Sequence, residues 1–216
     1  MVKKILIFCF FFGFQMLLSA QTIYLKNGKN FTDFKFVQSD GTQSPGFQQG
    51  VGDAFDLGIR YVLFKERSHL FGEVGVILNE YNALVGMKAN YINWKTYYVG
   101  IQNSIVYSFL NRNNYFMGIR LGANANKILY GKEEINGIIY DLRKENDFKR
   151  FLFQYVVGLD VKYNVTNQIS IGLGFSLVNS SNMSNSDLTK FFINNKQVMA
   201  SIFFIVNNTT DGKAHK

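Results

Sequence analysis

The sequence contains few of the residues on which disulfide scaffolds, thiol chemistry and histidine sites depend. It has one cysteine, one proline and two histidines in 216 residues, and only 18% of its residues are charged. A single cysteine excludes a disulfide framework. The 47% of hydrophobic residues exclude a disordered chain, and the same composition excludes a collagen-like one.

Aromatic residues and glycine are abundant instead. The chain has 22 Phe, 12 Tyr and 19 Gly, and its mean hydropathy is close to zero. Each glycine costs a helix about 1 kcal/mol, whereas aromatic residues favour strands. The composition therefore predicts one all-β domain with many short strands.

The first twenty residues have the pattern of a secretory signal peptide. Lys3 and Lys4 precede an apolar run at 5–18, which is shorter than the roughly 18 residues that a spanning helix needs. We expect cleavage after Ala20, with an uncleaved membrane anchor as the alternative. Cys9 lies inside the run, so the exported chain would contain no cysteine.

The exported chain is moderately basic. Removing Lys3 and Lys4 lowers the formal net charge from +8 to +6. No helix or stripe concentrates this charge, and the chain is expected to be exported, so we expect no nucleic acid as a partner. Outer-membrane lipid is the partner that we expect.

Alternation of large apolar residues with small or polar ones organises the remaining chain. Residues 169–177, for example, place Ile, Leu and Phe on one face and Ser and Gly on the other. The pattern predicts eight strands at 31–37, 55–61, 70–78, 97–109, 115–123, 153–163, 169–177 and 197–206.

The segments between these strands alternate in length. Three are short, at 64–69, 111–114 and 164–168, and four are long and polar, at 38–52, 79–96, 126–150 and 178–196. Transmembrane barrels place short turns in the periplasm and long loops outside the cell. We expect 132–150 to be the most exposed loop and to form a hairpin that extends its neighbouring strands.

Alternation alone does not say which face points outward, so a water-soluble barrel is an alternative. An eight-stranded barrel has room only for packed side chains or one small ligand, too little for so many aromatic residues. We therefore predict an eight-stranded antiparallel transmembrane β-barrel with short periplasmic turns and long extracellular loops. Its domains would be a signal peptide at 1–20, the barrel at 21–206 and a polar tail at 207–216. Aromatic residues near strand ends would form interfacial girdles, unless they reflect β-propensity alone.

Charged residues on the small, polar face would point into the lumen. The predicted lumenal ion-pair network consists of Asp56, Arg60, Glu73, Arg120, Asp160 and Lys162. The same alternation places Asp33 and Lys35 on this face, and we expect Gln102 and Gln154 as hydrogen-bond partners. Because an unpaired buried charge is costly, we expect these groups to pair and to plug the lumen. The alternative is that several reach a rim and stay hydrated.

Candidate catalytic, cofactor and metal sites are not found in the sequence. His69 falls in a predicted turn and His215 in the terminal tail, so neither is placed as a catalytic base. Gly172 and Gly174 lie within one strand, which is not the strand-to-helix context of a nucleotide loop. We expect no enzyme activity, no cofactor and no metal.

Several segments resemble a known family. They are Leu-Leu-Ser-Ala-Gln at 17–21, the stretches 24–31 and 90–100, and Ile-Asn-Gly at 135–137. They are similar to the small outer-membrane β-barrel proteins of the Bacteroidota, of the broad OmpA-like type. The resemblance implies an integral outer-membrane barrel exported through a cleaved signal peptide, and it implies no catalytic residues.

Four functions remain as hypotheses. We favour a structural or surface-interaction barrel, with a protein partner at the extracellular loops or the periplasmic rim. A secretion or envelope-biogenesis factor is second, a small pore third and an enzyme last.

Overall fold

The computed structural model describes residues 22–42, 47–64, 67–87, 90–112, 114–184 and 189–206. The predicted signal peptide at 1–20 and the polar tail at 207–216, which includes His215, lie outside the described residues.

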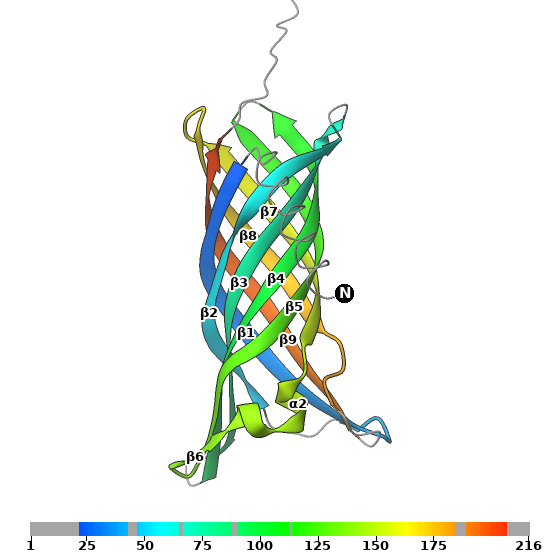
Figure 1. The fold of residues 1–216 in the computed structure, drawn as a ribbon, viewed down its shortest axis with the longest axis vertical. Helices are drawn as coiled ribbons and strands as arrows, with labels where there is room; N and C mark the ends of the chain where they lie inside the picture. The colour runs from blue at the N-terminus through cyan, green and yellow to red at the C-terminus, as the bar shows by residue number, and fades with distance from the viewer. Residues whose placement is uncertain are drawn as a thin grey trace, which may run out of the picture.

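The chain forms a closed barrel of antiparallel strands (Figure 1). The elements are β1 (Thr22–Gln38), β2 (Phe47–Phe64), β3 (Arg67–Met87), β4 (Asn90–Arg112), β5 (Tyr115–Ile135), β6 (Ile138–Asp141), η1 (Leu142–Lys144), α2 (Asn146–Lys149), β7 (Leu152–Asn164), β8 (Ile169–Ser180) and β9 (Thr189–Ile205). All of these strands except β6 form the ring, which confirms the predicted eight-stranded antiparallel barrel. Among the described residues, no helix is long and apolar enough to cross a membrane.

The first and last strands close the ring. β1 pairs with β9 from Thr22↔Ile205 to Gln38↔Thr189, and β4 pairs with β5 on the other side. Closure gives each ring strand a hydrogen-bonded neighbour on both sides, which satisfies the backbone without water. We call the end with Thr22 and Ile205 the turn end, and the opposite end the hairpin end.

The strands extend further than the alternation predicted. The expected loop 79–96 is a hairpin in which β3 and β4 pair from Leu70↔Tyr107 to Met87↔Asn90. Much of 38–52, 126–150 and 178–196 is also strand. The predicted boundaries of the long loops were wrong. Towards the hairpin end neither face of the sheet needs to be apolar, so the alternation ends, but the backbone hydrogen bonds between the strands continue.

The first strand starts nine residues before its predicted position, at Thr22 instead of Phe31. Tyr24 and Lys26 are buried in the lumen, and Ile23 is exposed on the outer wall. The alternation of apolar and polar residues is weak here because Asn27 and Lys29 also point outward.

The segment 132–150 forms a hairpin only in its first part. β5 and β6 pair from Lys132↔Asp141 to Ile135↔Ile138. Asn136 and Gly137 have φ values of 50° and 85°, as a tight hairpin turn requires at both central positions. The rest forms η1 and α2, which fold back over the hairpin end of the barrel (Figure 1).

The outer wall carries an apolar belt. Side chains of β7 alternate between buried and exposed, and Tyr155 is 67% exposed. The belt includes Leu57, Val76, Leu78, Ile101, Ile105, Leu121, Phe153, Val157, Leu159, Ile171, Leu173, Phe175, Val198 and Ile202. A soluble barrel with its apolar set inside is therefore excluded, because the large apolar side chains cover the outside.

Charged pairs border the belt towards the hairpin end. Lys29 forms an ion pair with Asp53, and Lys95 lies 2.9 Å from Glu80. These pairs span the outer wall from β1 to β4. Such a transition from apolar to charged surface is expected where a barrel leaves hydrocarbon.

Candidate functional site in the barrel lumen

Inward-facing side chains line the lumen and form three successive layers. Along β1 the order from the turn end is Lys26, Asn30 and Phe34, and along β5 it is Arg120, Asn126 and Ile128. Beyond the buried aromatic residues Tyr24 and Phe116 nearest the turn end, charged residues therefore come first, amides second and apolar residues last. We call these layers the ion-pair layer, the amide layer and the cap.

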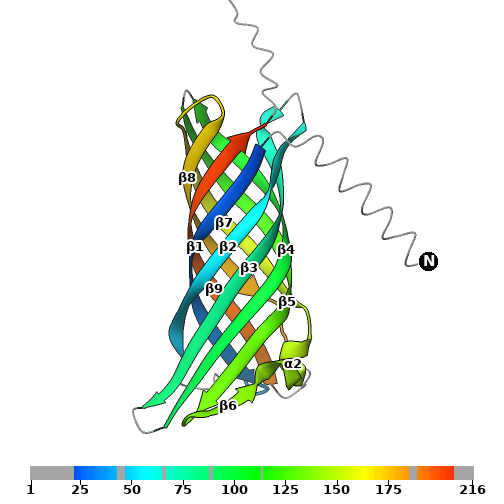
Figure 2. The same ribbon diagram turned by 60° about the vertical axis from the view of Figure 1, so that its left-hand side comes forward.

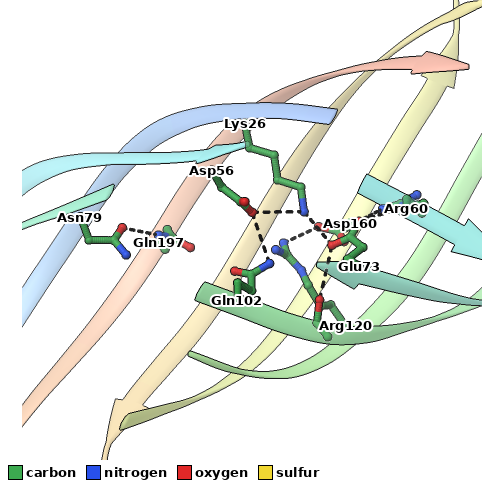
Figure 3. Close-up of polar contacts among 10 residues, drawn as sticks. Lys26, Asp56, Arg60, Glu73, Asn79, Gln102, Arg120, Asp160 and Gln197 are labelled. Atoms are coloured by element: carbon green, nitrogen blue, oxygen red, sulfur yellow. Dashed lines mark hydrogen bonds and ion pairs between the residues drawn. The ribbon is translucent and has the colours of Figure 1, made fainter. Parts of the chain in front are cut away.

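The ion-pair layer consists of six buried charged residues that come from five strands (Figure 3). They are Lys26, Asp56, Arg60, Glu73, Arg120 and Asp160, with three acids and three bases. An unpaired charge would be costly in an interior shielded from water. The equal numbers of acids and bases make the layer neutral in formal charge.

Glu73 is the central acceptor of this layer and is fully buried. Its carboxylate accepts hydrogen bonds from Lys26 Nζ at 2.8 Å and from Arg60 Nε at 2.8 Å. Lys26 lies on β1 and Glu73 on β3, so their contact passes across the inner face of β2. The layer thus links strands that are not neighbours in the sheet.

A second pair joins β5 to β7. Arg120 Nη2 lies 2.7 Å from Asp160 Oδ1. A Cβ atom on Gly174 would lie 2.7 Å from the same carboxylate oxygen and 3.2 Å from Arg120 Nη2. Gly174 therefore leaves the space that this ion pair occupies.

Looser contacts connect the charges around Glu73 to the Arg120–Asp160 pair and to Asp56. Arg60 Nη2 is 3.9 Å from Asp160 Oδ2, and Lys26 Nζ is 3.8 Å from Asp56 Oδ2. Gln102 Nε2 donates to Asp56 Oδ2 at 3.2 Å. The structure thus brings together Asp56, Arg60, Glu73, Arg120 and Asp160 of the predicted network.

Lys162 lies apart from that cluster. Among the described residues, no carboxylate is within ion-pair distance of Lys162. Its ammonium instead lies 5.3 Å from the ring centroid of Phe116 and 5.6 Å from that of Phe203. Arg60 shares both rings, at 5.2 and 4.6 Å. Cation–π contact therefore replaces the predicted ion pair of Lys162.

Asp33 and Lys35 do not face the lumen. They form a half-exposed pair at 3.4 Å on the outer wall, while Phe34 is buried inside. The assignment to the lumen was wrong because it assumed apolar-outward alternation along the whole strand. At the hairpin end the preference reverses, since Phe34 packs inside the cap and the charges point outward.

Lys26 is the member of the ion-pair layer that the sequence analysis missed. It lies in 22–30, before the predicted start of the first strand. The alternation of Ile23 and Leu25 with Tyr24 and Lys26 is the signal that could have extended the strand and assigned Lys26 to the lumen.

The amide layer joins side chains from different sides of the barrel. Asn30 Nδ2 donates to Asn79 Oδ1 at 3.1 Å, and Gln197 Nε2 donates to Asn30 Oδ1 at 3.1 Å. Gln154 Oε1 accepts from Tyr81 and from Asn126, so Gln154 supports this layer and not the charged one. Gln102 bonds with the ion-pair layer as predicted.

The cap is a cluster of buried apolar and aromatic side chains at the hairpin end of the lumen. It is formed by Phe34, Tyr81, Ala83, Trp94, Tyr98, Ile128, Leu142, Leu152, Phe148, Met183, Phe191 and Ile193. Leu142 of η1 and Phe148 of α2 are 2% and 4% exposed, so the segment after β6 contributes directly to the cap. The Trp94 ring centroid lies 5.4 Å from Phe34 and 5.5 Å from Phe148.

Metal-binding geometry is not found in the part of the chain that the structure describes, where no group of three or more His, Cys, Asp or Glu side chains could hold an ion. His69 is exposed near the start of β3. The lumenal carboxylates instead accept hydrogen bonds from cations. Chemically, the lumen combines the ion-pair layer, the amide layer and the apolar cap, with Lys162 beside the rings of Phe116 and Phe203.

A closed eight-stranded barrel with an apolar outer belt and buried inward-facing side chains is the architecture of a small transmembrane β-barrel. No protein-family model and no curated protein matches the sequence. Among solved structures, the chain is similar to Neisserial surface protein A at 13% identity and a TM-score of 0.49, over 85% of this chain and 96% of that one.

Two further structures have the same kind of likeness. The attachment invasion locus protein Ail of Yersinia pestis is 14% identical with a TM-score of 0.38, over 86% of this chain and 99% of that one. The outer membrane protein OprG of Pseudomonas aeruginosa is 11% identical with a TM-score of 0.44, over 86% and 96%. At such identities the assignment of this chain to transmembrane barrels rests on its own geometry.

Proposed function

We propose that this protein is an integral outer-membrane barrel that does not conduct ions and that displays a protruding sheet at the cell surface for contact with another protein. The apolar belt supports insertion, because only a closed barrel satisfies the backbone of strands in hydrocarbon. The turn end would lie in the periplasm and the hairpin end outside the cell.

The observation that carries the interaction role is the extension of β3, β4, β5 and β6 beyond the barrel mouth (Figure 2). β6 pairs with β5 on one side, and its other edge has no strand partner among the described residues. Ile138 and Ile139 on this strand are 60% and 64% exposed. Adjacent exposed isoleucines at an open strand edge are unnecessary for the barrel and suit a protein contact.

Crosslinking on intact cells tests this role. A photo-crosslinking residue in place of Ile139 should capture a discrete protein. The same residue in place of Thr42, which is exposed in the connection between β1 and β2, should not. An epitope inserted at Gly137, where a side chain would meet open space, should be accessible without permeabilisation. Capture of an envelope-assembly protein at the periplasmic rim, with none at Ile139, would favour the biogenesis role instead.

Two layers support the proposal that the lumen does not conduct. The ion-pair layer neutralises charge near the turn end, and the cap excludes water at the hairpin end. Purified wild-type barrel in planar bilayers should give no steady ohmic current. A stable conductance would favour the small-pore hypothesis.

We also propose that the protein is not an enzyme. His69 is exposed at the edge of β3, and the buried carboxylates contact Lys26, Arg60 and Arg120. Incubation of the refolded barrel with lipid and peptide substrates should leave them intact. Turnover above that of a heat-unfolded control would contradict this proposal.

A further inference from the structure

The outer wall over β7, β8, β9 and β1 has an apolar hollow in the belt. Its volume is about 580 Å³, and the outward side chains around it are large, including Leu25, Tyr163, Leu173 and Ile202. Ala200 lies among them, directly opposite Asn27 on β1 and Leu173 on β8. A small side chain surrounded by large ones produces the depression.

A second, polar hollow lies on the same wall towards the hairpin end. Its volume is about 430 Å³, and its lining combines polar and charged side chains with the apolar Phe31 and Leu177; the polar and charged ones include Asp33, Lys35, Gln49, Asn179, Asn194 and Lys196. Asp33 is neutralised by Lys35 at 3.4 Å. Lys196 therefore gives the hollow an excess positive charge, and the amides supply donors and acceptors for hydroxyl groups.

The two hollows are aligned along β9. Ala200, Val198, Lys196 and Asn194 follow one another on its outer face. Four residues of strand span about 13 Å, and one leaflet of hydrocarbon is about 15 Å thick. Because barrel strands tilt by about 40°, the two depressions are separated by about 10 Å along the membrane normal, which is within the depth of one leaflet.

We propose that this two-part groove binds one molecule of a phosphorylated glycolipid from the outer leaflet. Its acyl chain would occupy the hollow at Ala200, while its phosphate would contact Lys196 and its sugar hydroxyls would contact Asn179, Asn194 and Gln49. Charge complementarity and the amide-rich lining favour this lipid over a zwitterionic one. In a zwitterionic headgroup the phosphate is already neutralised by the headgroup's own cation, so Lys196 would gain less from contact with it. The inference rests on the proposed insertion in the outer membrane.

Native mass spectrometry of the full-length, detergent-solubilised barrel tests the proposal, with bis-phosphorylated lipid A and phosphatidylcholine as probes. Wild type should retain one lipid A molecule in preference to phosphatidylcholine. Lys196→Gln should weaken lipid A binding about tenfold, because a charge-assisted contact is lost. Ala200→Phe, which fills the apolar hollow, should weaken it by a similar factor.

Two controls separate the groove from general effects. Ala123→Leu changes an exposed alanine on β5 outside both hollows, and Lys190→Gln removes an exposed lysine outside both hollows. Neither should alter lipid A binding. If Ala200→Phe does not refold, Ala200→Leu replaces it, and Lys196→Gln remains an independent test.

Equal binding of the two lipids, or binding unchanged in both groove variants, would overturn the proposal. Liposome insertion is measured separately, as a difference in gel mobility between boiled and unboiled samples. A barrel that inserts but shows no preference contradicts the lipid site alone. A barrel that does not insert contradicts the proposed function itself.

Discussion

Lys26 Nζ lies 2.8 Å from Glu73 Oε2 although β1 and β3 are separated by β2. Glu73 also contacts Arg60 on β2, so one carboxylate joins three consecutive strands of the barrel. All three side chains are at least 96% buried. Charges held at such burial stabilise the barrel only while each has its partner.

Replacing Arg120 tests this dependence. Arg120→Ala removes the hydrogen-bonded partner of Asp160 and leaves only Arg60 at 3.9 Å, so it should destabilise the barrel by about 3–5 kcal/mol, the usual cost of breaking a buried ion pair. Urea unfolding of the refolded barrel in liposomes measures the change. Lys35→Ala breaks a half-exposed pair and should cost about 0–1 kcal/mol. Equal midpoints for the two variants would show that the lumen is hydrated.

The space at Gly174 provides a second test. Gly174→Ala places a methyl group against the Asp160 carboxylate and should cost about 1–3 kcal/mol through overpacking. In an Arg120→Ala/Asp160→Ala background the obstructing atoms are gone, so the same substitution should cost much less. A double-mutant cycle on unfolding free energies measures this coupling. Strict additivity would mean that Gly174 does not serve the ion pair.

Phe148 should control the environment of Trp94. Phe148 packs against Trp94 in the cap, and Phe148→Ala removes that contact. We expect red-shifted Trp94 fluorescence and faster quenching by acrylamide, because water reaches the indole. Phe151→Ala, on a 57% exposed side chain, is the control and should leave the emission unchanged. An unshifted spectrum in Phe148→Ala would show that α2 does not close the mouth.

The Asp141 carboxyl should remain ionised at unusually low pH. A side-chain hydrogen bond from Arg143 lowers the pKa of Asp141 to about 2. A depressed pKa adds stability above the ordinary carboxyl range, and this stability is lost as pH falls through about 2. Carbonyl-detected NMR titration measures the pKa directly. Arg143→Gln should return it towards its ordinary value, whereas Lys149→Gln should not; an unchanged titration in Arg143→Gln would contradict the assignment.

The sequence by itself determined the number and order of the ring strands, because a transmembrane strand must alternate between lipid and lumen. The alternation in runs such as 153–163 and 169–177 therefore predicts strands from the local sequence alone. The lumenal side chains Asp56, Arg60, Glu73, Arg120 and Asp160 were predictable for the same reason, since each stands at an inward position between apolar neighbours.

Only the tertiary structure decided which of these charges meet and where the apolar cap forms. Contact between Lys26 and Glu73 depends on the stagger of non-adjacent strands, which no local pattern encodes. Phe34 and Phe148 lie in the same buried cluster because α2 folds over the mouth. The mouth lies beyond the belt, where contact with lipid no longer determines which face of a strand points outward. There the surrounding water imposes no alternation, so packing partners alone determine which side chains turn inward.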